Sequence, residues 1–287
     1  MTPRSLVVRT RQKILLARWL SAPIRLARRA VGLGEEVEVR RDGLRWRLDL
    51  DEGIDFAIYL LGRFEAGTVR AYQRLVGPGD VALDIGANIG AHSLHLARLV
   101  GDTGRVTCFE PTSYAYAKLR RNLALNSTLA GRVTAEQVML TDPAHPEVEP
   151  FLFASWPLRA EESLHARHLG LARSTAGARA TTLDRYLEEK GISRVDFVKL
   201  DVDGHECAVL GGASGLLRDA GPTILLEISP YQLEEAGSSV GELLELLGSS
   251  GYGLSHLSSG RPLPMAVAEM RALVPPGASI NAIARVG

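Results

Sequence analysis

The chain has 287 residues, of which 46% are hydrophobic and 23% are charged, and its formal net charge is zero. This length and composition are typical of a globular protein with one main domain and additions. The balanced charge excludes a global field that would recruit nucleic acid, so we expect no nucleic-acid partner. No apolar run is long enough to span a bilayer, and two cysteines, Cys108 and Cys207, cannot make a disulfide framework. We therefore expect reduced thiols, no transmembrane segment and a cytoplasmic location.

The first 30 residues hold eight basic side chains and no acidic one. Several apolar residues in this stretch can share one face of a helix: Val7, Ile14, Leu15, Trp19 and Leu26. Such a helix could pack on the domain or on a second copy of the chain, which would give a homodimer. A helix that lies on a membrane surface is the other interpretation.

The remaining elements follow from apolar periodicity and turn residues. In chain order they are a hairpin over 37–50 that turns at Asp42-Gly43, a helix over 66–76, a strand over 81–85, a helix over 89–100, a strand over 106–109, a helix over 113–126, a strand over 133–140, a helix over 182–190, a strand over 196–200, a helix over 206–217, a strand over 223–228, a helix over 239–247 and strands over 252–257 and 280–286. Alternation of this kind predicts an α/β fold with a mostly parallel sheet and helices on both faces.

The pattern predicts two parts along the chain. Residues 1–60 are expected to form an N-terminal extension of a helix and a β-hairpin, and residues 61–287 the main domain. Within that domain, residues 143–175 lack apolar periodicity, and the segment is longer than an ordinary connecting loop in a compact domain. We expect this insertion to act as a lid over the site of the acceptor substrate.

Ligands of parallel sheets bind beyond the carboxyl ends of the strands. The residues at those ends are Asp84, Gly86, Ala87, Asn88, Gly90, Glu110, Pro111, Thr141, Asp142, Asp201, Asp203, His205 and Glu227. We therefore expect the functional site among them.

The loop from Asp84 to Gly90 has the spacing G-x-x-x-G, with Gly86 and Gly90 as its glycines. Dinucleotide-binding loops instead carry G-x-G-x-x-G, whose middle glycine lets the backbone meet a pyrophosphate. Here Asn88 places an amide in that region, which suits a ligand without phosphate. S-adenosylmethionine (SAM) is such a ligand, with Asp84 toward its ammonium, directly or through water, and Asn88 toward its carboxylate.

Glu110 ends the next strand and is followed by Pro111. A carboxylate at this place can accept hydrogen bonds from both hydroxyls of a ribose, as the acid of dinucleotide folds does. A glycine turn alone is weak evidence, but a turn together with this acid predicts a nucleotide-type cofactor site.

Six stretches in order resemble the FkbM-family methyltransferases, which belong to the class I SAM-dependent fold. They are LDIGANIG at 83–90, CFEP at 108–111, NLALN at 122–126, TTLDRYL at 181–187, FVKLDVDGHE at 197–206 and ILLEIS at 224–229. The resemblance runs from about Gly62 to the C-terminus. It leaves out the arginine-rich N-terminal stretch and residues 143–175.

The resemblance implies a Rossmann-like, seven-stranded sheet whose final strand is antiparallel. It also implies methyl transfer from SAM to a hydroxyl of a small natural product or sugar, such as a polyketide or related metabolite. The segment around Glu65 is similar to a family segment that approaches the methionine end of SAM. The chain departs from the family at Asp203, where Glu is common.

A hydroxyl acceptor is a poor nucleophile and needs help to lose its proton. His205 has the right unperturbed pKa for a general base, with Asp203 beside it, although a histidine at a helix N-terminus can also serve as a local hydrogen-bonding group. Asp201 and Glu227 end adjacent strands and could share Mg²⁺, or else support SAM and a loop. An NAD(P)-dependent oxidoreductase is the alternative function, against which the G-x-x-x-G spacing argues.

Overall fold

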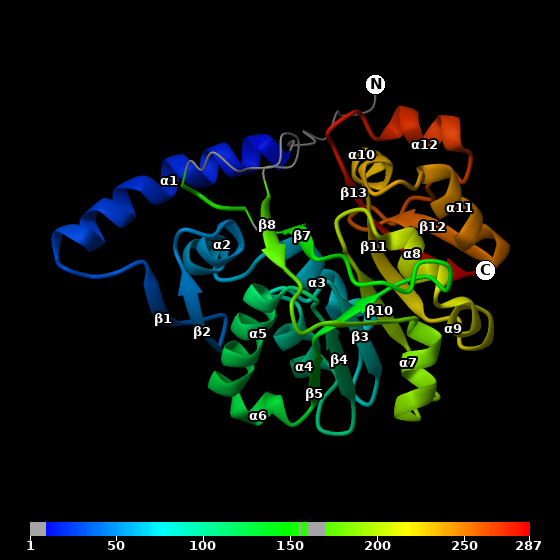
Figure 1. Ribbon diagram of the computed structural model, residues 1–287, viewed down its shortest axis with the longest axis horizontal. Coiled ribbons are helices and arrows are strands. Elements are labelled where there is room, and N and C mark those ends of the chain that lie inside the picture. The colour runs from blue at the N-terminus through cyan, green and yellow to red at the C-terminus, as the bar shows by residue number, and fades with distance from the viewer. Residues whose placement is uncertain (1–9, 155, 160–169) are drawn as a thin grey trace.

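Seven strands form the central sheet of the computed structural model, which describes residues 10–154, 156–159 and 170–287 (Figure 1). Their order across the sheet is β12 (Tyr252–His256), β13 (Ile280–Val286), β11 (Thr223–Ile228), β10 (Phe197–Leu200), β3 (Val81–Ile85), β4 (Arg105–Phe109) and β5 (Val133–Glu136). β13 is antiparallel to both β11 and β12, whereas β11, β10, β3, β4 and β5 pair in parallel. The predicted seven-stranded, mostly parallel sheet with an antiparallel last strand is confirmed.

Helices cover both faces of this sheet, as predicted. Those of one face are α3 (Ala66–Leu75), α4 (Ser93–Leu99) and α5 (Ser113–Leu125), with α6 (Ser127–Ala130) after them. Those of the other are α7 (Leu183–Lys190), α8 (Glu206–Gly211), α9 (Ser214–Asp219), α10 (Pro230–Glu235), α11 (Val240–Ser249) and α12 (Val267–Leu273). Each group buries its apolar residues in a separate hydrophobic cluster against the sheet.

The N-terminal part consists of α1 (Thr10–Ala30), β1 (Glu36–Arg41), β2 (Leu44–Asp49) and α2 (Gly53–Leu61). β1 and β2 form the predicted hairpin around Asp42-Gly43. Alternate residues of β2, with Trp46 at their centre, are buried in the cluster that also holds α3 to α5. The Oδ1 atoms of Asn122 and Asn126 accept hydrogen bonds of 2.9 Å from the backbone of β2. These asparagines of the NLALN stretch therefore tie the hairpin to α5, while the boundary expected at residue 60 stays a prediction.

The insertion and the residues on either side of it contain more regular structure than the sequence predicts. β7 (Phe151–Ala154) pairs antiparallel with β8 (Leu171–Ser174), and β6 (Val138–Leu140) pairs in parallel with β9 (Arg179–Thr181). The single strand predicted over 133–140 is wrong, because the chain leaves the main sheet at Gln137 and starts a second small sheet. The helix predicted over 206–217 is also wrong as one unit, since it breaks between α8 and α9.

The described helices include none that is both long and apolar enough to cross a membrane. In Figure 1, α1 lies along the outside of the molecule, next to α2 and away from the sheet.

Candidate functional site

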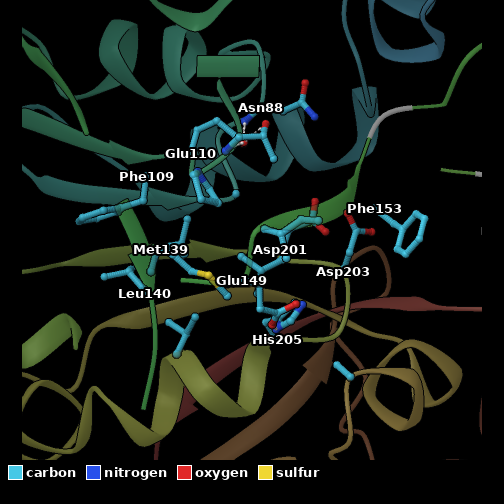
Figure 2. Close-up of a pocket in the computed structure, with 18 of the residues that line it drawn as sticks. Asn88, Phe109, Glu110, Met139, Leu140, Glu149, Phe153, Asp201, Asp203 and His205 are labelled. Carbon is cyan, nitrogen blue, oxygen red and sulfur yellow. Dashed lines mark hydrogen bonds and ion pairs between the residues drawn. The ribbon is translucent and has the colours of Figure 1, made fainter. Parts of the chain in front are cut away.

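A cavity of about 410 Å³ opens at the carboxyl ends of β3, β4 and β10, and the insertion closes one side of it. Figure 2 shows side chains from several elements turned toward this space. The cavity brings together seven of the residues expected from sequence: Gly86, Asn88, Glu110, Pro111, Asp201, Asp203 and His205. Its volume is in the range of small-molecule sites.

The glycine loop is shaped by close contact with the end of β10. Gly86 has a φ of +81°, and a Cβ built on it would lie 1.8 Å from the backbone oxygen of Asp201. Only glycine fits there, so Gly86 lets the loop pack directly against the end of β10. Asn88, with a φ of +48°, also adopts the left-handed conformation, which asparagine tolerates. Gly90 packs against Leu119 instead, where a Cβ would come within 2.8 Å.

Glu110 fixes the glycine loop as well as facing the cavity. Its Oε2 accepts from the backbone N–H of Asn88 at 2.9 Å, and its Oε1 accepts from the N–H and the hydroxyl of Thr112 at 2.9 and 2.5 Å. Burial raises the pKa of Glu110, while these hydrogen bonds favour the charged form. A carboxylate can accept about four hydrogen bonds. Because three protein donors already bind Glu110, it can accept about one more, from a ligand hydroxyl.

A buried lysine that the sequence analysis missed lies behind the loop. Lys199 is 2% exposed, and its Nζ lies 3.2 Å from Asp201 and 3.6 Å from Asp84. Burial opposes the charge of Lys199, but the two carboxylates outweigh it and raise its pKa. Asp84 itself is fully buried, accepts a 2.5 Å hydrogen bond from Ser93 and does not line the cavity. The signal for Lys199 was a lysine inside a four-residue apolar strand, which needs a buried acid as partner.

His205 lies on the cavity wall opposite the glycine loop. Its Nδ1 is 3.6 Å from Oε1 of Glu149, a residue of the insertion that the sequence analysis did not single out (Figure 2). Burial lowers the pKa of His205, and the negative charge of Glu149 partly opposes that shift. The imidazole is therefore neutral near pH 7 and able to accept a proton.

Asp203 lines the same wall, in a left-handed backbone conformation with a φ of +51°. Its Oδ1 accepts a 2.8 Å hydrogen bond from the amide of Gln232. Asp203 is partly exposed to solvent. Partial burial of its carboxyl group and the negative charge of Asp201 raise the pKa of Asp203 to about 7. Solvent on the exposed side limits that shift.

Several expected site residues lie outside the lining of the cavity: Glu65, Asp84, Ala87, Gly90, Thr141, Asp142 and Glu227. Thr141 is buried against β9, and Asp142 accepts hydrogen bonds from the backbone of Ala144 and His145. Glu65 directly precedes α3, and its Oε2 accepts a 3.0 Å hydrogen bond from Thr68. Contact of these seven residues with a cofactor stays a prediction.

The residues expected to hold Mg²⁺ do not fit a metal. Glu227 accepts a 2.5 Å hydrogen bond from Ser279, and Asp201 faces the Lys199 ammonium. Across the ranges that the structure describes, no group of three or more His, Cys, Asp or Glu side chains could hold a metal ion. Mg²⁺ prefers near-octahedral oxygen coordination, which two carboxylates beside a buried cation do not supply.

The fold and this cavity define a Rossmann-like protein of the class I methyltransferase architecture, with its site at the carboxyl end of a mostly parallel sheet. The family model described as methyltransferase FkbM domain matches residues 84–254. The chain therefore belongs to the FkbM family of methyltransferases. This membership overturns the oxidoreductase alternative.

Two curated relatives and one solved structure are similar to the chain. The "31-O-demethyl-FK506 methyltransferase FkbM" of Streptomyces tacrolimicus is 29% identical over 69% of this chain and 83% of its own length. The "2-O-methyltransferase NoeI" of Sinorhizobium fredii is 26% identical over 65% of this chain and 80% of its own. A SAM-dependent methyltransferase structure from Aquifex aeolicus is 15% identical, with a TM-score of 0.40 over 80% of this chain and 93% of that one.

Proposed function

We propose that this methyltransferase uses SAM and methylates a hydroxyl on a small natural product or sugar. The names of the two curated relatives support oxygen as the methylated atom, since both describe O-methylation. The acceptor is therefore a small molecule, for which the cavity has the appropriate size.

One observation carries the proposal: a single cavity joins the glycine loop and Glu110 to His205. The loop end fits SAM, because Glu110 presents a carboxylate that can accept from a ribose hydroxyl and that also holds the loop backbone at Asn88. Asn88 and Asp201 line the cavity beyond it and suit the methionine end. When bound, SAM supplies an electrophilic methyl group on a sulfonium.

The cavity also suits an acceptor with apolar surface. Residues of the insertion and of β6 contribute apolar side chains there: Met139, Leu140, Phe151, Leu152 and Phe153. These side chains can exclude water and orient the acceptor, which is the main requirement of an in-line displacement.

His205 then removes the proton of the acceptor hydroxyl. With SAM bound, the acceptor oxygen would take the methyl group from its sulfonium, leaving a neutral thioether, and the hydroxyl proton would pass to the neutral imidazole. Glu149, 3.6 Å away, stabilises the resulting imidazolium. Asp203 lines the same side of the cavity as His205. Its carboxylate can accept a hydrogen bond from the acceptor or from a water molecule.

The proposal is tested by incubating the enzyme with SAM and a panel of polyketide and sugar alcohols. Mass spectrometry should detect the gain of one CH₂ unit on a hydroxyl-bearing acceptor. Two calorimetric titrations under the same conditions, one with SAM and one with NAD, should show binding of SAM only. Binding of NAD, or methylation of nitrogen alone, would contradict the proposal.

A further inference from the structure

The outward face of α1 is an apolar stripe. Between residues 15 and 30, the exposed residues are apolar with the exception of Arg29: Leu15, Leu16, Trp19, Ala22, Pro23, Leu26, Ala27 and Ala30. The large ones are strongly exposed, at 51% for Leu15, 58% for Leu16, 75% for Trp19 and 71% for Leu26. The spacing of three and four residues places them along one side of the helix.

The arginines of α1 whose side chains the structure describes, other than Arg29, are turned toward the protein instead. Arg18 donates to the backbone oxygen of Pro157 at 3.1 Å, and Arg25 pairs with Asp51 at 3.2 Å. Arg28 donates to the backbone oxygen of Gly34 at 2.9 Å. Even the exposed Arg29 pairs with Glu35, at 2.7 Å. The inner face of α1 is thus already bound to its own chain, and only the apolar stripe is left to contact another molecule.

These charges argue against an anionic membrane as the occupant of the stripe. A helix that binds such a surface combines its apolar face with free Lys and Arg at the flanks. The described arginines of α1 are turned inward or paired. An uncharged stripe selects an uncharged partner surface.

The middle of the stripe, from Trp19 to Leu26, is arranged symmetrically about a point between Ala22 and Pro23, whereas Leu16 farther out is matched by Arg29. In an antiparallel pair of α1 helices, Trp19 of one copy would meet Leu26 of the other, and Ala22 would meet Pro23. Such self-complementarity is the requirement of a two-fold interface, and small residues at its centre allow close approach. We propose that two copies of this chain form a dimer through antiparallel pairing of their α1 helices.

The exposed area fits such an interface. With about 200 Å² for a large apolar side chain, the four large residues expose on the order of 500 Å² per copy. That is more than half of the roughly 800 Å² that each partner buries in a standard interface. It also reaches the size at which exposed apolar patches mark interaction sites.

Cysteine cross-linking tests the arrangement directly, because Cys108 and Cys207 are both buried. Ala22→Cys lies next to the two-fold axis and should give a disulfide-linked dimer under mild oxidation. Ala30→Cys lies about 11 Å along the helix from the axis, so its two copies would be about 22 Å apart. That separation is too large for a disulfide, which needs Cα atoms within about 7 Å. Equal cross-linking of both variants, or of neither, would overturn the antiparallel pairing.

Sedimentation gives an independent measurement. The wild type should be a dimer at micromolar concentration, and Trp19→Glu or Leu26→Glu should make it monomeric without loss of SAM binding. Leu273→Glu on α12, where the leucine is 47% exposed, is the matched control and should remain dimeric. A monomeric wild type overturns the proposal. If that monomer floats with phosphatidylglycerol vesicles and Trp19→Glu does not, the stripe binds membrane instead.

Discussion

Glu149→Gln removes a charge next to the proposed base while keeping the shape of the side chain. Burial lowers the pKa of His205, and the negative charge of Glu149 works against that shift. Loss of the charge should therefore lower the pKa further. A base is active when it is neutral, so activity falls as pH decreases through this pKa. The acidic limb of the pH profile should consequently move to lower pH.

The size of the movement follows from the geometry. Oε1 of Glu149 lies 3.6 Å from Nδ1 of His205, and the Glu149 side chain is 51% exposed. Solvent screening at such a site brings the Coulomb energy close to its value in water, about 1 kcal/mol. One pKa unit corresponds to about 1.4 kcal/mol. We expect the limb to shift down by about half to one pH unit, with little change in turnover at pH 8.

The assay is kcat/KM for the acceptor from pH 5 to 9 with SAM in excess. Glu147→Gln is the control, since Glu147 is an exposed acid of the same segment that does not line the cavity. His205→Ala should lower turnover by about a hundred- to ten-thousand-fold, with SAM affinity within a few-fold. An unmoved limb in Glu149→Gln, or full turnover of His205→Ala across this range, would refute the assignment of the base.

The other predictions concern the cofactor end of the site. Glu110→Ala should weaken SAM binding by roughly 2 kcal/mol in calorimetry, because it removes a charged acceptor and frees the glycine loop; unchanged affinity would reassign the end of β4. Gly86→Ala should abolish SAM binding and lower Tm, since its Cβ would strike Asp201, whereas Gly67→Ala, with open space around it, should do neither. Lys199→Met should lower the free energy of unfolding by about 3–5 kcal/mol in urea, because it leaves Asp84 buried without its cation; a smaller loss would mean that Asp84 is neutral. EDTA should leave turnover unchanged, and restoration by Mg²⁺ after a loss would show that Asp201 and Glu227 do bind metal.

Where local sequence held the whole signal, prediction of the fold was accurate. The strands predicted over 81–85, 223–228 and 280–286 have the observed bounds of β3, β11 and β13. Each is a short apolar run between turn residues, and these two features are enough to predict a strand that is buried in a sheet. The glycine loop and Glu110, singled out from the sequence, likewise line the cavity.

Errors arose where contacts distant in sequence decided the structure. The helix after β10 breaks at Gly212, where a Cβ would lie 2.2 Å from the backbone oxygen of Thr141. Thr141 itself is buried at this contact and does not line the cavity. The short helices α2, α10 and α12 were not predicted, because helices of six to nine residues are stable only through tertiary packing.

The sequence by itself determined the family, the α/β alternation of the main sheet and a glycine loop that lines the cavity, since these depend on local periodicity and on motifs. Only the tertiary structure brought Glu149 to His205 and Lys199 between Asp84 and Asp201. It also turned Arg18 and Arg25 of α1 inward and Leu15, Leu16 and Leu26 outward. Those placements depend on which groups, far apart in sequence, come close enough in space to neutralise a buried charge. The periodicity of a sequence carries no information about the distance between elements in space.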